Sequence, residues 1–471
     1  MAEIIIFLLF GFFTLVTLFY ILIIYPNFLR TRSHFVSNVD EAELLLEISK
    51  IKLVPKYCIQ ITTKGNEANT ILNGLKQLQS IYQTLDRKIQ TLLRVDILTE
   101  LASDKNYFAN HDFTYPLSVH VVPAEYTTKN GAMLKGRALQ YMITKRFHEN
   151  EVLDNLFIIH FDAESIVTRS NLITMLFSTL VQSDKRIFQG QIFYPKNWFK
   201  SGILSRQMES LRPWNCYECH SNTKRSFPYH LHGSNLIIRA DVEHEVGWDY
   251  KPVEGYPVVA EDLFFGIFAT FLLGRKIFGW HGAVMYEQPA LTLLSSLKQR
   301  VRWIRGSLQA LHVVPEWEVY RSLSILERTK FQFKMRSKLY VYGIGFIPAI
   351  ITLVVFVTIV ISFLYSGLVH TSISDRIDNY RSMTSELPSW IINFTTFGAF
   401  LWLLTIQIGL YHNISPLELK PHQRLIEHLK ILLITPLATI FDTGCVVYTL
   451  IKWSVGNHKA QWDVTPKEIS M

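Results

Sequence analysis

The sequence predicts an α/β domain with a parallel sheet and with membrane-associated helices at both ends. Between residues 56 and 161, short apolar runs alternate with amphipathic stretches of helical periodicity, which is the pattern of strands joined by crossover helices. Near each end of the chain, apolar runs are long enough to cross a bilayer. A chain of 471 residues has room for both parts.

The composition also favours a membrane protein. Hydrophobic residues make up 49% of the chain and aromatic residues 13%, which is high for a soluble domain. The net charge of +8 is spread without a long Lys/Arg block, so it favours a membrane surface and anionic ligands, and we expect no nucleic-acid partner. Four cysteines in a chain of this length do not make a disulfide framework, which favours reducing surroundings.

The first segment is predicted to be an N-terminal transmembrane helix within residues 1–28, because residues 4–24 contain no charge. Arg30 and Arg32 follow it, and the positive-inside rule then places the next domain in the cytosol. A cleaved signal peptide is the alternative. However, no Lys or Arg precedes the run, and no small-residue cleavage site follows it.

The central domain is assigned to residues 50–306. Its predicted strands cover residues 57–62, 92–98, 118–122, 155–161 and 236–239, and its predicted helices cover residues 66–80 and 136–150. Ligands of open α/β sheets bind beyond the carboxyl ends of the strands. Those ends carry Thr62, Thr63, Glu100 and the group from His160 to Ser165.

Charged side chains near the fourth predicted strand are candidates for a phosphate site. Asp162 and Glu164 follow that strand, and two such carboxylates can hold Mg²⁺ or Mn²⁺ between phosphates. Lys135 and Arg137, earlier in the chain, can contact phosphate directly. The alternatives are a solvated turn for the acidic pair, since D-x-E is common, and an ordinary basic helix face for the other two.

An acidic pair, Glu261-Asp262, opens an apolar helical stretch, and the segment from Gln299 to Trp303 follows at a distance. A carboxylate near an apolar wall can act as a general base. Arg302 can hold a diphosphate oxygen, and Trp303 can stack on a sugar ring. An acidic pair alone is more often a charged helix N-terminus, but its combination with Q-x-x-R-W favours a catalytic site.

Two further motifs lie between these groups. The segment from Cys216 to His220 has the C-x-x-C-H pattern, but a zinc site with His230 or His232 lacks a convincing second ligand pair, so we expect a loop over an acceptor site. The turn His232-Gly233-Ser234-Asn235 gives the backbone room to approach a sugar, although it could also be a plain turn.

The order of these motifs resembles the family 2 inverting glycosyltransferases, which have the Rossmann-like GT-A fold. HGSN, RA, EVGWD and AEDLFF, together with VVPxxY, GAxxKxRAL and EQP…QRVRWIRG, resemble the egghead family of animal GDP-mannose:glucosylceramide β-1,4-mannosyltransferases. The resemblance runs from about Lys56 to Gly306. Asp162 and Glu164 take the place of the D-x-D of the larger family, with Glu164 as a departure from it.

This resemblance implies an inverting transfer of mannose from GDP-mannose to glucosylceramide, in glycosphingolipid biosynthesis. It gives the base role to Asp262, beside Glu261, and the Mn²⁺ or Mg²⁺ ligands are then Asp162 and Glu164. The expected donor-binding residues are Thr62, Thr63, Glu100, Lys135, Arg137, Asp162, Gln299, Arg302 and Trp303. The expected acceptor-binding residues are His232, Gly233, Ser234, Asn235 and Trp303. We expect a multi-pass protein of the Golgi or endoplasmic reticulum with its catalytic domain in the cytosol.

The C-terminal part is predicted to return to the membrane. An interfacial amphipathic helix is expected at 308–323, within an interfacial region at 307–338, with Trp317 and Tyr320 as anchors. Transmembrane segments are expected within 339–453, at 340–365, 390–411 and 431–451.

The tail, residues 454–471, contains Trp462 to Lys467, which resembles the gating segment of cellulose synthase. One span before the domain and three after it would put the tail on the luminal side, away from a cytosolic site. Either that resemblance is accidental or the segment containing Pro436 is re-entrant.

Two other functions fit parts of this pattern. A processive polysaccharide synthase of the hyaluronan or cellulose type shares E-D and Q-x-x-R-W, but four hydrophobic segments are few for a channel. A non-catalytic membrane lipid-binding protein is the other alternative, and the intact acidic and Q-x-x-R-W motifs argue against it.

The orientation gives a first prediction. Protease added to sealed microsomes should degrade residues 56–306, because Arg30 and Arg32 hold the domain on the cytosolic side. The sequons at Asn393 and Asn413 should remain unglycosylated, and immunoblotting with and without detergent reads both results. Full protection of the domain in intact vesicles would contradict this orientation.

Overall fold

The computed structural model describes residues 25–32, 35–65, 67–225, 231–347, 349–350 and 389–456, with isolated positions elsewhere. The predicted N-terminal span lies largely outside the described residues, as do nearly half of the predicted span at 340–365 and nearly all of the tail. Asn66, at the start of the predicted helix at 66–80, and His230, which the sequence suggested as a zinc ligand, also lie outside them.

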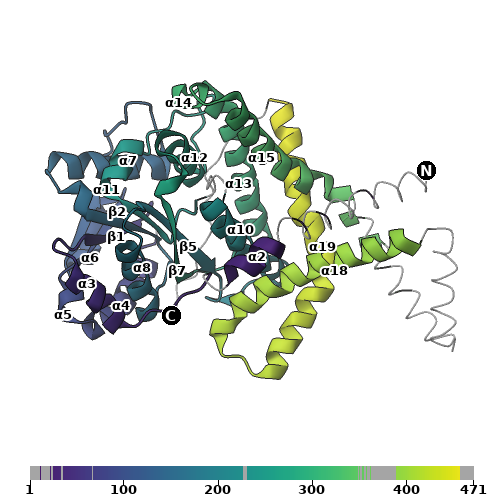
Figure 1. Ribbon diagram of the computed structural model, residues 1–471, viewed down its shortest axis with the longest axis horizontal. Helices are drawn as coiled ribbons and strands as arrows, with labels where there is room; N and C mark the ends of the chain where they lie inside the picture. Colours follow the sequence, from purple (N-terminus) through teal and green to yellow (C-terminus); the bar gives the residue numbers. More distant parts are fainter. Residues whose placement is uncertain are drawn as a thin grey trace.

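A seven-stranded sheet with the order β3-β2-β1-β4-β6-β5-β7 forms the centre of the domain (Figure 1). The strands are β1 (Lys56–Thr62), β2 (Leu93–Thr99), β3 (Leu117–Val121), β4 (Leu156–Asp162), β5 (Ile187–Phe193), β6 (Leu236–Arg239) and β7 (Phe278–Tyr286). The predicted strands are all present, and β5 and β7 were not predicted. The α/β fold class is therefore confirmed.

The prediction of parallel strands is confirmed for the first four strands of the chain, but it does not extend to the whole sheet. The first four strands in the sheet order are parallel, but β6 runs antiparallel to both β4 and β5, while β7 is parallel to β5. In the register of β4 and β6, His160 lies opposite Leu236. The segment that leads into β6 therefore starts beside the carboxyl end of β4, where the sequence placed its acidic residues.

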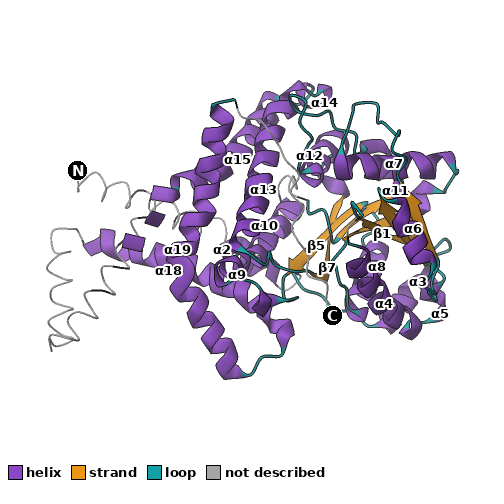
Figure 2. Ribbon diagram, turned by 180° about the vertical axis from the view of Figure 1, so that it is seen from behind, coloured by secondary structure: helices purple, strands orange, loops and turns teal. Residues whose placement is uncertain are grey.

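Helices cover both faces of the sheet, as the two views in Figures 1 and 2 show. On one face, α3 (Glu41–Lys50), α4 (Ala68–Thr84) and α8 (Arg169–Val181) pack on an apolar core that includes Ile59, Leu75 and Leu172. On the other, α7 (Leu134–His148), α11 (Ala240–Val246) and α12 (Glu261–Leu273) pack around Met142 and Phe264. Each such buried side chain contributes about 1.5–3 kcal/mol by leaving water.

A buried polar network also lies between the sheet and α7. Glu243 accepts hydrogen bonds from Trp248 Nε1 at 2.9 Å and from Arg146 at 3.2 Å, and His160 Nε2 lies 3.1 Å away. Glu243 and Arg146 are almost fully buried, so each charge needs the other. This network ties α7 and α11 to β4, which ends in Asp162.

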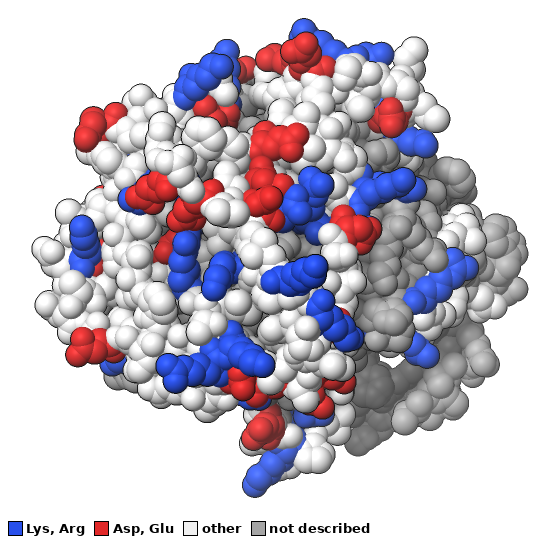
Figure 3. All heavy atoms as spheres, turned by 60° about the vertical axis from the view of Figure 1, so that its left-hand side comes forward, with Lys and Arg blue, Asp and Glu red and all other residues white. Residues whose placement is uncertain are grey.

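Of the remaining described α-helices, five precede β7 in the sequence and five follow it. They are α2 (Tyr25–Thr31), α5 (Arg87–Gln90), α6 (Ala102–Ala109), α9 (Ile203–Ser210), α10 (Arg212–Arg225), α13 (Leu293–Val313), α14 (Glu318–Arg321), α15 (Ile325–Ile344), α18 (Ser389–Ile414) and α19 (Pro421–Ser454). On the face shown in Figure 3, Lys and Arg lie among Asp and Glu instead of forming one basic surface.

The predicted interfacial helix at 308–323 was wrong. The helix that carries Q-x-x-R-W, α13, continues to Val313, and a 3-10 turn containing Pro315 then separates it from α14. Trp317 contacts Tyr250 and the α12 phenylalanines, and Tyr320 is buried. Tyr320 is therefore part of the protein core, and Trp317 is partly buried against it.

Two described helices, Phe397–Leu417 and α19, are long and apolar enough to cross a membrane, by length and composition only. They overlap the predicted segments at 390–411 and 431–451. Both also contact the domain: Asn413, which is fully buried, accepts from Tyr194 N at 2.9 Å and donates to Glu209 O at 3.0 Å. The helix α19 continues through Pro436, so it gives no support for a re-entrant break there.

Candidate active site

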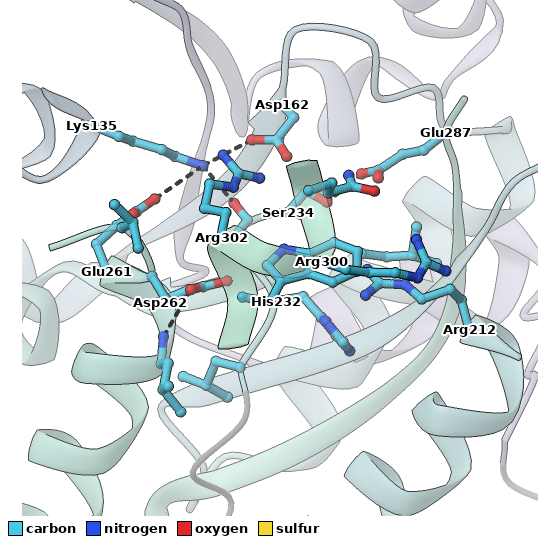
Figure 4. A pocket seen from close by; sticks show the side chains of 18 of the residues that line it. Lys135, Asp162, Arg212, His232, Ser234, Glu261, Asp262, Glu287, Arg300 and Arg302 are labelled. Atoms are coloured by element: carbon cyan, nitrogen blue, oxygen red, sulfur yellow. Dashed lines mark hydrogen bonds and ion pairs between the residues drawn. The ribbon is translucent and has the colours of Figure 1, made fainter. Parts of the chain in front are cut away.

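A cavity of about 470 Å³ lies at the carboxyl ends of β1 and β4. Its walls come from α7, α10, α12 and α13, and its far end comes from α15 and α19. The predicted site residues that line it are Thr62, Thr63, Glu100, Lys135, Asp162, Glu164, His232, Gly233, Ser234, Glu261, Asp262, Gln299, Arg302 and Trp303. Residues distant in sequence thus meet in one place (Figure 4).

Two predicted site residues lie outside this lining. Arg137 donates to Pro123 O at 2.8 Å and lies 3.9 Å from Glu100, so it supports a loop instead of facing the cavity. Asn235 is fully buried, and its amide donates to Gln191 O at 2.6 Å and to Ala283 O at 3.1 Å. The Asn235 side chain therefore joins β5 and β7, which lie on the same side of β6 in the sheet.

The Lys135 ammonium occupies the centre of the charged part of the cavity (Figure 4). Lys135 Nζ lies 2.8 Å from Asp162 Oδ1, 3.9 Å from Glu261 Oε1 and 3.3 Å from the carbonyl oxygen of Gly233. Burial alone would lower the pKa of Lys135, but the charges of Asp162 and Glu261 raise it above its ordinary value. Lys135 was predicted to contact a donor phosphate, and here it joins carboxylates from two elements.

The loop before α7 explains how Lys135 reaches this position. Asp249 accepts the backbone N–H of Asn130 at 2.8 Å and that of Ala132 at 3.3 Å. Gly136 packs so closely that a Cβ there would lie 3.1 Å from the carbonyl oxygen of Trp248. The G-A-x-x-K and G-W-D motifs therefore fit together as one support for α7.

The acidic pair forms the first residues of α12. Burial raises the pKa of Glu261 to about 7, although Lys135 opposes the shift, and burial also raises the pKa of Asp262. Asp262 Oδ1 accepts the Leu263 N–H at 2.8 Å. Asp262 Oδ2 faces the turn before β6, where a Cβ on Gly233 would lie 3.5 Å from it. Glu261 is thus held by Lys135, while Asp262 faces the predicted acceptor turn.

Glu287 follows the end of β7 and joins the turn after β4 to the turn before β6. It accepts hydrogen bonds from Ser165 Oγ at 3.1 Å and from Ser234 Oγ. Ser165 Oγ also accepts the backbone N–H of Asp162 at 3.0 Å. E-Q-P is part of the sequence resemblance, but no role for Glu287 follows from it, because only the sheet order brings β7 into this group.

The other end of the cavity is built on α13. Arg300 and Trp303, three residues apart, share one helix face, and the Arg212 guanidinium lies 4.0 Å from the Trp303 ring centre. Arg212 also donates to Tyr194 Oη at 2.9 Å. One face of Trp303 is therefore in contact with Arg212, so a sugar would have to use the other face or the ring edge. The roles of Arg212 and Arg300 were not predicted.

Asp162 and Glu164, at the end of β4, are the candidate metal ligands. No group of three or more His, Cys, Asp or Glu side chains that could hold a metal occurs in the part of the chain that is described. Mg²⁺ often needs only one or two carboxylates, with phosphates and water as its other ligands. Asp162 and Glu164 both line the cavity and fit that arrangement. Lys135 contacts Asp162, so it would share this carboxylate with an ion.

The C-x-x-C-H segment is helical and not the loop that we expected. It lies in α10, where Cys216 is buried and Cys219 lines the cavity. Cys216 Sγ is 3.9 Å from His232 Nε2. With no group of three metal-binding side chains among the described residues, the structure gives no support for zinc here.

Comparison with known proteins supplies the family. The model of glycosyl transferase family group 2 matches residues 157–412, which include Asp162, the acidic pair and Q-x-x-R-W. The chain belongs to this family. The match, together with the central sheet, confirms the fold class predicted from the sequence.

Relatives of the chain include Beta-1,4-mannosyltransferase egh of Drosophila melanogaster, 29% identical over 268 residues, which are 55% of this chain and 54% of that protein. Beta-1,4-mannosyltransferase bre-3 of Caenorhabditis elegans is 26% identical over 285 residues, 58% of this chain and 57% of that protein. These matches confirm the resemblance to the egghead family. The glycosyltransferase chain spans about half the length of the relatives that it matches.

Among solved structures, the chain is similar to mannosyltransferase PcManGT of Pyrobaculum calidifontis, which was solved with GDP-Man and Mn²⁺. The similarity covers 87% of this chain and 100% of that chain, with 14% identity and a TM-score of 0.45. A similarity this low supports no statement about the ligands of the present protein.

The raised pKa values predict that the rate of glycosyl transfer decreases at low pH. Only an ionised carboxylate accepts a proton, and burial raises the pKa of Glu261 to about 7 and also raises that of Asp262. Glycosyl transfer should therefore fall at low pH as Asp262 takes up a proton, at a pH above the ordinary pKa of an aspartate. Initial rates at saturating substrate test this. Constant rates down to about pH 4, the ordinary range of an aspartate, would contradict it.

Substitution of the acidic pair gives a second test. Asp262→Asn keeps the shape but removes the base, so transfer should fall roughly 10²-fold or more. Donor binding should persist, because Asp162 and Glu164 are separate from Asp262. Glu261→Gln serves as the matched control and should have the milder effect, since Glu261 contacts Lys135 instead of the Gly233 turn. The reverse ranking would move the base role to Glu261.

Proposed function

We propose that the protein is an inverting β-1,4-mannosyltransferase that transfers mannose from GDP-mannose to glucosylceramide. The main support is the arrangement of the cavity. The Lys135 ammonium lies between the acidic pair Glu261-Asp262 and Asp162 at the end of β4. The chain also belongs to a family of glycosyltransferases. The names of the egh and bre-3 relatives support the sugar and the linkage. The acceptor and the nucleotide rest on the motif resemblance.

In this mechanism, Asp262 takes the proton of the acceptor hydroxyl as that oxygen attacks the anomeric carbon. It lies in the first turn of α12 and lines the cavity, and its raised pKa makes it a stronger base than an exposed aspartate. Glu261 and Lys135 form the adjacent ion pair that holds the start of α12 in place. One displacement would invert an α-linked donor into a β-linked product.

The departing nucleoside diphosphate carries the charge that must be stabilised. A divalent ion supplies Lewis-acid stabilisation of that charge when it is bound, and Asp162 and Glu164 would hold it together with donor phosphates. Arg302 lies on α13 at the same cavity and adds a positive charge, as its effect in lowering the pKa of Glu261 and Asp262 indicates. Thr62, Thr63 and Glu100 line the sheet end, where the nucleotide would bind.

The acceptor would enter from the opposite end. That end is lined by Leu339 of α15 and Val446 of α19, and α19 is one of the two helices apolar enough to cross a membrane. A lipid acceptor carries its sugar at the membrane surface, so an apolar end beside such a helix suits it. We propose that the protein acts in the Golgi or endoplasmic reticulum membrane with this cavity facing the cytosol.

A panel of sugar nucleotides with glucosylceramide in nanodiscs tests this function directly. Full-length protein should form a single glycolipid product from GDP-mannose, and mass spectrometry and linkage analysis should give one added β-1,4-mannose. GDP-glucose and UDP-sugars are the matched controls. A long polymer would favour a processive synthase, and no turnover with any donor would favour a lipid-binding protein.

Metal removal gives a separate prediction. Excess chelator should abolish transfer, and Mn²⁺ or Mg²⁺ should restore it, because Asp162 and Glu164 fit an ion shared with phosphates. Asp162→Asn should weaken GDP-mannose binding in the presence of Mn²⁺ more than in its absence, measured by calorimetry. Full activity in excess chelator would remove the ion from the mechanism, with Lys135 and Arg302 as the remaining cations.

A further inference from the structure

The apolar helix α19 carries an aspartate, Asp442, into the cavity. Between residues 428 and 454 it is the sole acidic residue of that helix. A carboxylate in an apolar helix is costly unless it is paired, and it is a candidate functional group when it is retained there. Asp442 lines the same cavity as Glu261 and Asp262, although it is far from them in sequence.

The partner of Asp442 is Arg300, within the Q-x-x-R-W segment. Arg300 Nε donates to Asp442 Oδ1 at 2.5 Å, while Arg300 Nη1 donates to Glu209 Oε1 at 3.0 Å. The Arg300 side chain is 7% exposed, and that of Glu209 is 1% exposed. Arg300 is therefore fixed between two carboxylates from different helices, and it lies on the same face of α13 as Trp303.

Asp442 differs from Glu209 in being accessible, because its side chain is 28% exposed. Among the described residues, Asp442 Oδ1 contacts Arg300, and no hydrogen bond to Asp442 Oδ2 is present. The surrounding wall combines the apolar Leu339 and Val446 with the Trp303 ring. Such a wall fits a molecule that has a hydroxylated sugar next to an apolar tail, since carboxylate oxygens accept hydrogen bonds from sugar hydroxyls.

We propose that Asp442 is a specificity-determining residue for the acceptor, contributed by the C-terminal helix. Its Oδ1 fixes Arg300 and with it the turn of α13 that carries Trp303, and its Oδ2 accepts a hydrogen bond from an acceptor hydroxyl. This inference rests on the proposed transferase function. It makes α19 part of the active site as well as a candidate membrane helix.

Alternatively, Asp442 only holds α19 against α13 and does not contact the acceptor. A second acidic residue of α19 provides a matched control for this alternative. Glu427, one of the other charged residues of α19, accepts from Arg206 at 2.6 Å and from Trp198 Nε1 at 3.0 Å. Its side chain is 3% exposed, and it does not line the cavity. Glu427→Gln makes the same chemical change as Asp442→Asn on the same helix, so it reports loss of a tether alone.

The experiment measures transfer by full-length protein in nanodiscs, with GDP-mannose and glucosylceramide varied separately, and the thermal unfolding midpoint of each variant. Asp442→Asn should lower kcat/KM for the acceptor by roughly tenfold to a hundredfold, the usual effect of losing a hydrogen bond to a charged group. The KM for GDP-mannose should stay near the wild-type value. Asp442→Glu should recover part of the acceptor kcat/KM.

Glu427→Gln should lower the unfolding midpoint at least as much as Asp442→Asn while leaving the acceptor KM unchanged. If Glu427→Gln does not fold, Thr435→Val replaces it, since Thr435 accepts from Gln207 at 3.3 Å away from the cavity. Equal acceptor kinetics for Asp442→Asn and the control would overturn this inference alone. An inactive wild-type protein would overturn the proposed function and this inference with it.

Discussion

The ammonium of Lys135 is the group on which the charged part of the cavity depends. It contacts Asp162 and Glu261 and acts electrostatically on Asp262, so it offsets the repulsion among carboxylates gathered in a buried space. Without that charge, burial and mutual repulsion would raise the pKa of the acidic pair further and favour its protonated form. The hydrogen bonds from the loop before α7 to Asp249, and the lack of a Cβ at Gly136, serve to bring this ammonium to the carboxylates.

The direction of β6 determines how the two halves of the site meet. A short antiparallel strand next to β4 places its own N-terminal turn beside the carboxyl end of β4. Gly233 and Ser234 consequently lie next to Asp162, and Glu287 accepts hydrogen bonds from both Ser165 and Ser234 across the gap. A parallel strand in that position would start at the opposite edge of the sheet, and the turn would lie far from the acidic residues.

The apolar end of the cavity connects the sheet domain to the C-terminal helices. Arg300 and Trp303 lie on α13, Glu209 lies on α9, and Asp442 lies on α19, so the Q-x-x-R-W helix and a helix apolar enough to cross a membrane share one ion network. Burying an ion pair costs desolvation energy, and the attraction between the two charges offsets this cost only when their geometry is good. Here the geometry fixes the face of α13 that carries Trp303 and holds α19 against it.

The sequence alone determined the α/β class, the first four strands and a set of candidate site residues, most of which line the cavity, because alternating apolar periods and short motifs are local properties of the chain. It did not determine the antiparallel direction of β6. Of the two expected membrane anchors, Tyr320 is buried in the core and Trp317 packs against it. The roles of Lys135, Glu287 and Asp442 also came only from the tertiary structure. Each of these side chains interacts with partners from elements that are distant in the chain. A local pattern of residues does not show which distant groups come into contact when the chain folds.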